Sequence, residues 1–105
     1  MTMLPVVLST LAQEDIYDIA SYLAGQSRDT GIRFYDQVDR TLELLEQMPE
    51  LGTVCHFGNT GAEIRVWPVR GFPNHLVFYR ITPNVMTTIL RIQHGSTNYE
   101  TLFQG

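Results

Sequence analysis

The spacing of apolar residues changes near the middle of the chain, and this change limits the folds that are possible. Before residue 49 the apolar side chains recur at helical intervals. After residue 62 they follow the two-residue period of strands, over residues 63–67, 75–81 and 86–94. Residues 49–62 are rich in glycine and turn formers, so we expect a long surface loop there. The chain is therefore expected to be helical first and stranded afterwards.

Two helices are expected after a short strand at residues 5–8. Ser9 or Thr10 can cap the first helix, and Gly25 can stop it. The second helix should start after residue 29 or 30 and end at Pro49. A link of about five residues would make the pair an antiparallel hairpin. The expected buried stripe of the second helix is Phe34, Val38, Leu42 (or Leu45) and Met48.

These elements predict an α+β fold in the order β-α-α-β-β-β, with the helical hairpin packed on one face of a largely antiparallel sheet. At 105 residues the chain has room for a single domain, residues 1–105. We expect the strand at 86–94 to turn Met86, Leu90 and Ile92 toward the helices. Its outward face would then carry Ile89, Arg91 and Gln93.

The charges are divided unevenly between the two halves of the chain. The net charge is −4 and there is no lysine. Residues 1–50 hold nine carboxylates against three arginines, a balance of −6, whereas residues 51–105 hold four arginines against two carboxylates, a balance of +2. An acidic chain without lysine is poorly suited to grip long nucleic acid, so we expect no direct DNA binding. Any recognition of an anion is expected in the second half.

The sequence gives no sign of export or of a cofactor. The N-terminus has no basic segment and no apolar run long enough for a signal or a membrane span, so a cytoplasmic protein is expected. The single Cys55 allows no internal disulfide. No phosphate-binding glycine loop or nucleophile motif is present. We expect neither a cofactor nor a metal.

Three groups of polar residues are candidates for sites of chemistry. His56, His75 and His94 lie 19 residues apart each time, which is not the spacing of a helical zinc site. Cys55 adjoins His56, an awkward geometry for a catalytic pair, and a thiol on a loop is the simpler interpretation. Carboxylates at helical spacing are most simply a solvated face; they are Asp15, Asp18, Asp36, Asp39 and Glu43.

Arginine occurs inside each of the three apolar strands of the second half, at Arg65, Arg80 and Arg91. Long charged side chains are unexpected there unless they reach an edge or a binding surface. One interpretation is a surface that binds a target. The other is that these are outward charges paired with Glu63 or with acids of the helices.

Several segments, in this order and spacing, resemble the RelE/ParE toxin family, and the similarity is closest to the ParE, or plasmid-stabilisation, branch. Residues 12–23 are similar to the family's first helix, and residues 48–52 (MPELG) to the proline–glycine signature that closes its second. The second half of the family is matched by residues 65–69 (RVWPV), 71–80 (GFPNHLVFYR) and 89–95 (ILRIQHG). The resemblance extends over nearly the whole chain.

The resemblance implies a toxin encoded beside an antitoxin that neutralises it, here a ParD-like partner in a hetero-oligomer. Antitoxins of this family wrap around a hydrophobic groove and a sheet edge of the toxin. We expect the antitoxin to contact apolar residues around the helical hairpin, namely Tyr17, Tyr22, Leu23 and Phe34. ParE-branch toxins block DNA gyrase, whereas RelE-branch toxins cleave mRNA on the ribosome.

The choice between these targets depends on the residues, because the two branches share a fold. Cleavage of mRNA without a metal needs a base, an acid and cationic groups. An acidic chain without lysine favours inhibition of gyrase by binding, with no catalytic residues. The residues expected to bind the target are Arg65, Arg80, Arg91, His94 and Tyr99. The same residues could form a nuclease site, so a ribosome-dependent mRNA endoribonuclease is the alternative.

One departure from the family pattern concerns the segment after His94-Gly95. The family usually has an arginine at this point, and here Ser96-Thr97-Asn98 follows. If that arginine contributes to toxicity, this chain is expected to be weaker or to act on another target.

Overall fold

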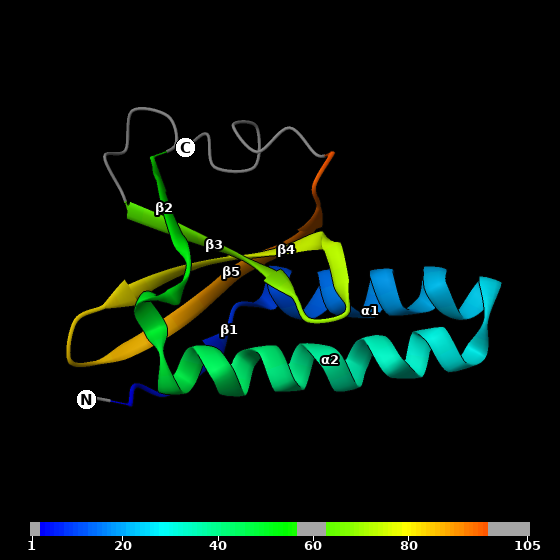
Figure 1. The fold of residues 1–105 in the computed structure, drawn as a ribbon, viewed down its shortest axis with the longest axis horizontal. Helices are drawn as coiled ribbons and strands as arrows, with labels where there is room; N and C mark the ends of the chain where they lie inside the picture. Colours follow the sequence, from blue (N-terminus) through cyan, green and yellow to red (C-terminus); the bar gives the residue numbers. More distant parts are fainter. Residues whose placement is uncertain (1–2, 57–62, 97–105) are drawn as a thin grey trace.

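Two antiparallel helices lie along one face of a five-stranded sheet in the computed structural model, which describes residues 3–56 and 63–96 (Figure 1). The elements are β1 (Val6–Leu8), α1 (Thr10–Gln26), α2 (Arg28–Gln47), a 3-10 turn (Pro49–Leu51), β2 (Thr53–His56), β3 (Glu63–Val69), β4 (Phe72–Thr82) and β5 (Met86–His94). The strand order is β1-β5-β4-β3-β2. Only the pair β1 and β5 is parallel. The predicted α+β class and helical hairpin are confirmed.

The helix α1 begins where the sequence predicts, because Ser9 caps it. The Ser9 hydroxyl accepts a hydrogen bond from the backbone N–H of Ala12 at 3.0 Å. The link between the helices is shorter than predicted, since Ser27 alone separates α1 from α2. Gly31 permits this tight joint: a Cβ there would lie 2.7 Å from the Cβ of Ala24. Neither helix is both long and apolar enough to cross a membrane, within the residues described.

The stripe predicted for α2 is largely confirmed. Phe34, Val38 and Leu45 are buried in the core between the helices and the sheet. Leu42 is half-buried against the same core. Met48 is exposed, so its assignment to the stripe was wrong. The helix ends at Gln47 and the chain turns at Pro49, which takes Met48 off the helical face.

The prediction of a loop over residues 49–62 was wrong for its first part. A 3-10 turn is followed by β2, which pairs antiparallel with β3 from Thr53 opposite Val66 to His56 opposite Glu63. Cys55, expected on a loop, is half-buried in this strand. Residues 57–62 lie outside the described part of the chain. The strand was missed because it is formed by pairing with β3, while its local composition favours turns.

The predicted facing of β5 was also partly wrong, because of a β-bulge. Phe78 of β4 pairs with Arg91, and the next residue, Tyr79, pairs with Ile89, so Leu90 is an extra residue in β5. Ile89 and Ile92 are therefore both buried against the helices. Leu90 packs on the opposite face of the sheet with Ile64 and Phe78, and Met86 is half-buried. The prediction holds for Ile92 and fails for Leu90 and Ile89.

Candidate functional site

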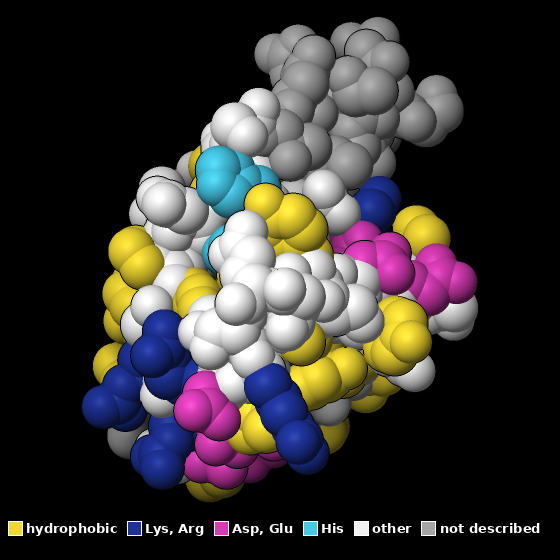
Figure 2. Space-filling view, turned by 90° about the vertical axis from the view of Figure 1, so that its right-hand side faces the viewer, with side chains coloured by type: hydrophobic (Ala, Val, Ile, Leu, Met, Phe, Trp, Pro, Cys, Tyr) yellow, Lys and Arg dark blue, Asp and Glu magenta, His cyan; other side chains and the backbone are white. Residues whose placement is uncertain are grey.

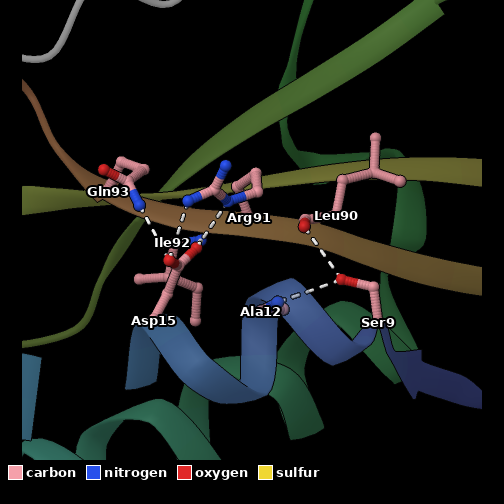
Figure 3. Close-up of polar contacts among 7 residues, drawn as sticks. All are labelled: Ser9, Ala12, Asp15, Leu90, Arg91, Ile92 and Gln93. Atoms are coloured by element: carbon pink, nitrogen blue, oxygen red, sulfur yellow. Dashed lines mark hydrogen bonds and ion pairs between the residues drawn. The ribbon is translucent and has the colours of Figure 1, made fainter. Parts of the chain in front are cut away.

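Arg91, predicted to be a target-binding residue, is bound to α1 through Asp15 (Figure 3). Its Nε and Nη2 atoms donate to the two carboxylate oxygens of Asp15 at 2.8 and 2.9 Å. Asp15 also accepts the backbone N–H of Ile92 at 3.0 Å and the side-chain amide of Gln93 at 2.9 Å. The side chains of Arg91 and Asp15 are only 20% and 8% exposed. The expectation that Arg91 and Gln93 point outward was therefore wrong.

This contact exists because β1 is too short to cover the edge of β5. β1 pairs with β5 only from Thr87 to Ile89. Beyond that point the start of α1 supplies the partners, because the Ser9 backbone N–H donates to the Ile89 carbonyl. The Ser9 hydroxyl donates to the Leu90 carbonyl (Figure 3). Hydrogen bonding and the charge of Asp15 raise the pKa of Arg91 above its usual value, against the opposing effect of burial. The guanidinium is a fixed positive charge within this junction.

Arg65 and Tyr79 lie opposite each other on β3 and β4 and together hold the turn that follows α2. Arg65 Nη1 donates to the carbonyls of Glu50 and Gly52 at 3.0 and 2.9 Å. The Tyr79 hydroxyl accepts the Gly52 backbone N–H at 2.8 Å and donates to the Pro49 carbonyl at 2.7 Å. Burial raises the pKa of Tyr79. The hydroxyl therefore keeps its proton and its role as donor at neutral pH.

These contacts give a physical reason for the proline–glycine signature noted in the sequence. A Cβ added at Gly52 would lie 2.6 Å from the Tyr79 hydroxyl, so only glycine fits at this position. Pro49 supplies the carbonyl that the same hydroxyl binds. The guanidinium of Arg65, like that of Arg91, is used inside the molecule.

Of the other residues predicted to bind a target, Arg80 and His94 are not brought together. Arg80 is exposed and lies opposite Thr88 of β5, whereas His94 is exposed at the end of that strand. Six residues of extended strand separate Thr88 from His94, which is about 20 Å. Tyr99 lies outside the described residues. The role of Arg80, His94 and Tyr99 at a target stays a prediction.

His94 instead lies beside His75, a pairing that sequence reasoning missed. The centroids of the two rings are 5.3 Å apart and the ring planes are nearly perpendicular. The His75 ring also packs edge-on against Phe34. Burial lowers the pKa of His75, and the charge of His94 lowers it further. A hairpin without the bulge would pair His75 with Gln93. In the part of the chain described here, no group of three side chains could hold a metal.

The residues expected to contact an antitoxin differ in their exposure. The side chains of Tyr17 and Tyr22 on α1 are 65% and 68% exposed. Leu23 is half-buried against the core. Phe34 is completely buried and packs edge-on against Phe72, so its assignment to the surface was wrong. Contact of the other three with an antitoxin stays a prediction.

Comparison with known proteins identifies the family to which the chain belongs. A family model described as the ParE toxin of the parDE type II toxin–antitoxin system matches residues 6–99. No curated protein gives a significant match. The matched range takes in every helix and strand and both of the arginine contacts, at Arg65 and Arg91. The chain therefore belongs to the ParE toxin family and is the toxin of a type II toxin–antitoxin system, a class whose partner is an antitoxin.

Proposed function

We propose that this toxin acts in the cytoplasm by binding and inhibiting DNA gyrase, without chemistry of its own. The observation that carries the proposal is that the cations suited to a nuclease site do not converge. Arg65 and Arg91 donate to groups of the chain itself. Arg80 and His94 are about 20 Å apart along the sheet. A phosphoryl-transfer site needs its acid, base and cations within hydrogen-bonding reach of one phosphate.

The alternative, a ribosome-dependent mRNA endoribonuclease, is favoured by one specific contact. His75 and His94 are close enough to act as a base and an acid on one substrate. The lowered pKa of His75 keeps its ring neutral near pH 7, the form required of a base. However, the His75 ring is partly enclosed by Phe34 and Phe72, which limits its access to a bulky substrate.

The proposed antitoxin contact uses the outward side of α1. Tyr17 and Tyr22 are large, apolar and exposed, and Leu23 lies next to Tyr22 in the same helix. Exposed aromatic side chains of this kind suit the apolar face of an amphipathic partner segment. A ParD-like antitoxin bound here would form the hetero-oligomer in which the toxin is held inactive.

The experiment that decides the target compares purified gyrase with translating ribosomes. We expect the toxin to inhibit supercoiling by gyrase in the absence of ribosomes and to leave message lengths intact when it is induced in cells. The variant His75→Phe, which keeps an aromatic ring beside Phe34 and changes no residue predicted to bind the target, should retain this inhibition if the histidine pair has no catalytic role. Cleavage of mRNA within codons, lost in His75→Phe and with gyrase unaffected, would show that the nuclease alternative is correct.

A further inference from the structure

Three arginines that sequence reasoning did not select form one surface, which we call the arginine face: Arg33, Arg40 and Arg70. Figure 2 shows several basic side chains gathered at the lower left of the view, with acidic side chains among them and a further basic side chain at the right. Arg33 and Arg40 are seven residues apart on α2, which places them on one side of the helix about 10 Å apart. Arg70 joins them from the β3–β4 turn, because its backbone N–H donates to the Thr41 hydroxyl at 3.0 Å.

The arginine face is held rigidly, because the β3–β4 turn is docked on α2. Thr41, which accepts the Arg70 N–H, donates its own proton to the carbonyl of Gln37 at 2.7 Å. Gly71 adopts a positive φ of 77° and packs beside the Gln37 side chain. The Arg33 guanidinium lies over the Phe72 ring, 5.2 Å from its centroid, a cation–π contact. The cations are therefore positioned before any partner arrives.

Among the described residues the charges of the arginine face have no ion-pair partner, in contrast to Arg91. Within residues 3–56 and 63–96 the structure contains one ion pair, between Arg91 and Asp15. Asp29 and Asp36 lie one helical turn before Arg33 and Arg40, yet neither forms a pair with them in the described part of the chain. As far as the described residues show, three guanidinium groups thus keep their N–H donors available for an external anion.

The surroundings of the arginine face favour a carboxylate-bearing protein segment over nucleic acid. A guanidinium matches a carboxylate in a bidentate geometry. Asp29, Asp36 and the acidic surface around the arginines would repel the phosphates of a long nucleic acid that extend past the three arginines, whereas a short carboxylate segment can be confined to them. The face is also polar, unlike the exposed tyrosines of α1, and polar contacts suit a reversible encounter more than a permanent complex.

We propose that the arginine face docks an acidic segment of the toxin's protein target. Taking gyrase as that target rests on the function proposed above; the chemistry of the surface does not. Arg33 and Arg40 come from the acidic half of the chain. Folding adds Arg70 from the other half, because the β3–β4 turn docks on α2.

The test compares charge reversals of equal size in a gyrase supercoiling assay. We expect Arg40→Glu and Arg70→Glu each to raise the toxin concentration for half inhibition by about tenfold or more, as loss of a charge-complementary contact would. The control is Arg28→Glu, which makes the same change in net charge at the exposed first residue of α2 and should stay within about twofold. Thermal unfolding verifies that all three variants are folded.

A second measurement separates this proposal from the proposed function. A fluorescein-labelled octaglutamate peptide and a labelled 20-base-pair DNA duplex are titrated with each protein and followed by anisotropy. Binding of the peptide that is lost in Arg40→Glu and kept in Arg28→Glu supports the arginine face even if gyrase is not inhibited. Equal inhibition of gyrase by wild type and both face variants overturns the proposal while the gyrase function stands. Absence of peptide binding, or tighter binding of the duplex through the same arginines, overturns it as well.

Discussion

The junction between α1 and β5 and the arginine face use the same side chain for opposite purposes. At the junction Arg91 donates to Asp15 and is mostly buried. On the arginine face Arg40 and Arg70 have no carboxylate partner in the described structure. The difference teaches that an arginine inside an apolar strand can be a structural residue, while the arginines free to bind a partner lie on a helix and a turn. The position of a charge in the sequence does not indicate which role it has.

Replacing Asp15 with alanine gives the largest effect expected from this comparison. The change leaves Arg91, the Ile92 N–H and the Gln93 amide without their shared acceptor. We expect the free energy of unfolding to fall by about 3–5 kcal/mol, measured by urea denaturation. The exposed Asp18 on the same helix is the matched control, and Asp18→Ala should change stability by less than about 0.5 kcal/mol. Equal effects of the two changes would contradict a structural role for the junction.

Replacing Tyr79 with phenylalanine tests whether the turn after α2, which Arg65 also contacts, depends on buried hydrogen bonds as the junction does. The buried Gly52 N–H loses its acceptor and the Pro49 carbonyl loses a donor. The free energy of unfolding should fall by about 2–3 kcal/mol. Hydrogen exchange at the Gly52 amide should accelerate more than exchange in α1. Unchanged protection at Gly52 would mean that Arg65 holds this turn without the hydroxyl.

Direct comparison of two arginines sharpens the distinction further. Arg91→Ala removes the Asp15 pair, and we expect a loss of about 1–2 kcal/mol, reduced by the partial exposure of the pair. Arg40→Ala should leave stability within about 0.5 kcal/mol, since Arg40 is exposed and makes no ion pair among the described residues. Chemical denaturation of both variants at one pH measures the difference. A larger loss for Arg40 would reverse the assignment of the two regions.

The smallest expected effect concerns His75 and its dependence on pH. Burial keeps the pKa of His75 below 6.5 in the folded protein, so the unfolded chain binds a proton at a higher pH than the folded one. The stability contributed by His75 is therefore complete above about pH 7 and is lost as the pH falls below 6.5 toward the folded pKa. His75→Phe keeps an aromatic ring beside Phe34 and removes the titration.

The measurement is unfolding at pH 7.5 and pH 5.5. Between pH 7.5 and pH 5.5 the free energy of unfolding should fall more in wild type than in His75→Phe. The difference between the two decreases should be less than about 1 kcal/mol, because the histidine is only partly buried. An identical loss in wild type and His75→Phe would exclude His75 as the source.

Much of the fold was predictable because its signals are local. The helical spacing of Phe34 and Val38, the Ser9 cap and the alternating strands all act within a few residues. What failed depends on partners distant in sequence: β2 is a strand because β3 pairs with it, and the bulge at Leu90 reverses which residues of β5 face the core. A single inserted residue is enough to exchange the two faces of a strand.

The site was less predictable than the fold for the same reason. Asp15 and Arg91 are 76 residues apart, so no local pattern could have matched them. The arginine face did leave a signal, since Arg33 and Arg40 repeat at a seven-residue interval on a helix predicted from the same sequence. The net negative charge of residues 1–50 led to the expectation that any anion-binding residues would lie in the second half, so these two arginines were overlooked.

The junction between α1 and β5 also constrains the order in which the protein can assemble. β1, Ser9 and Asp15 are made before β5, and all of them bind it, the last strand within the described residues. During synthesis the first helix therefore leaves the ribosome well before its partners exist. Closing a contact over some 80 residues is slow compared with forming a helix. The pairing of β1 with β5 can form only after β5 has been made, so we expect this contact to form late in folding.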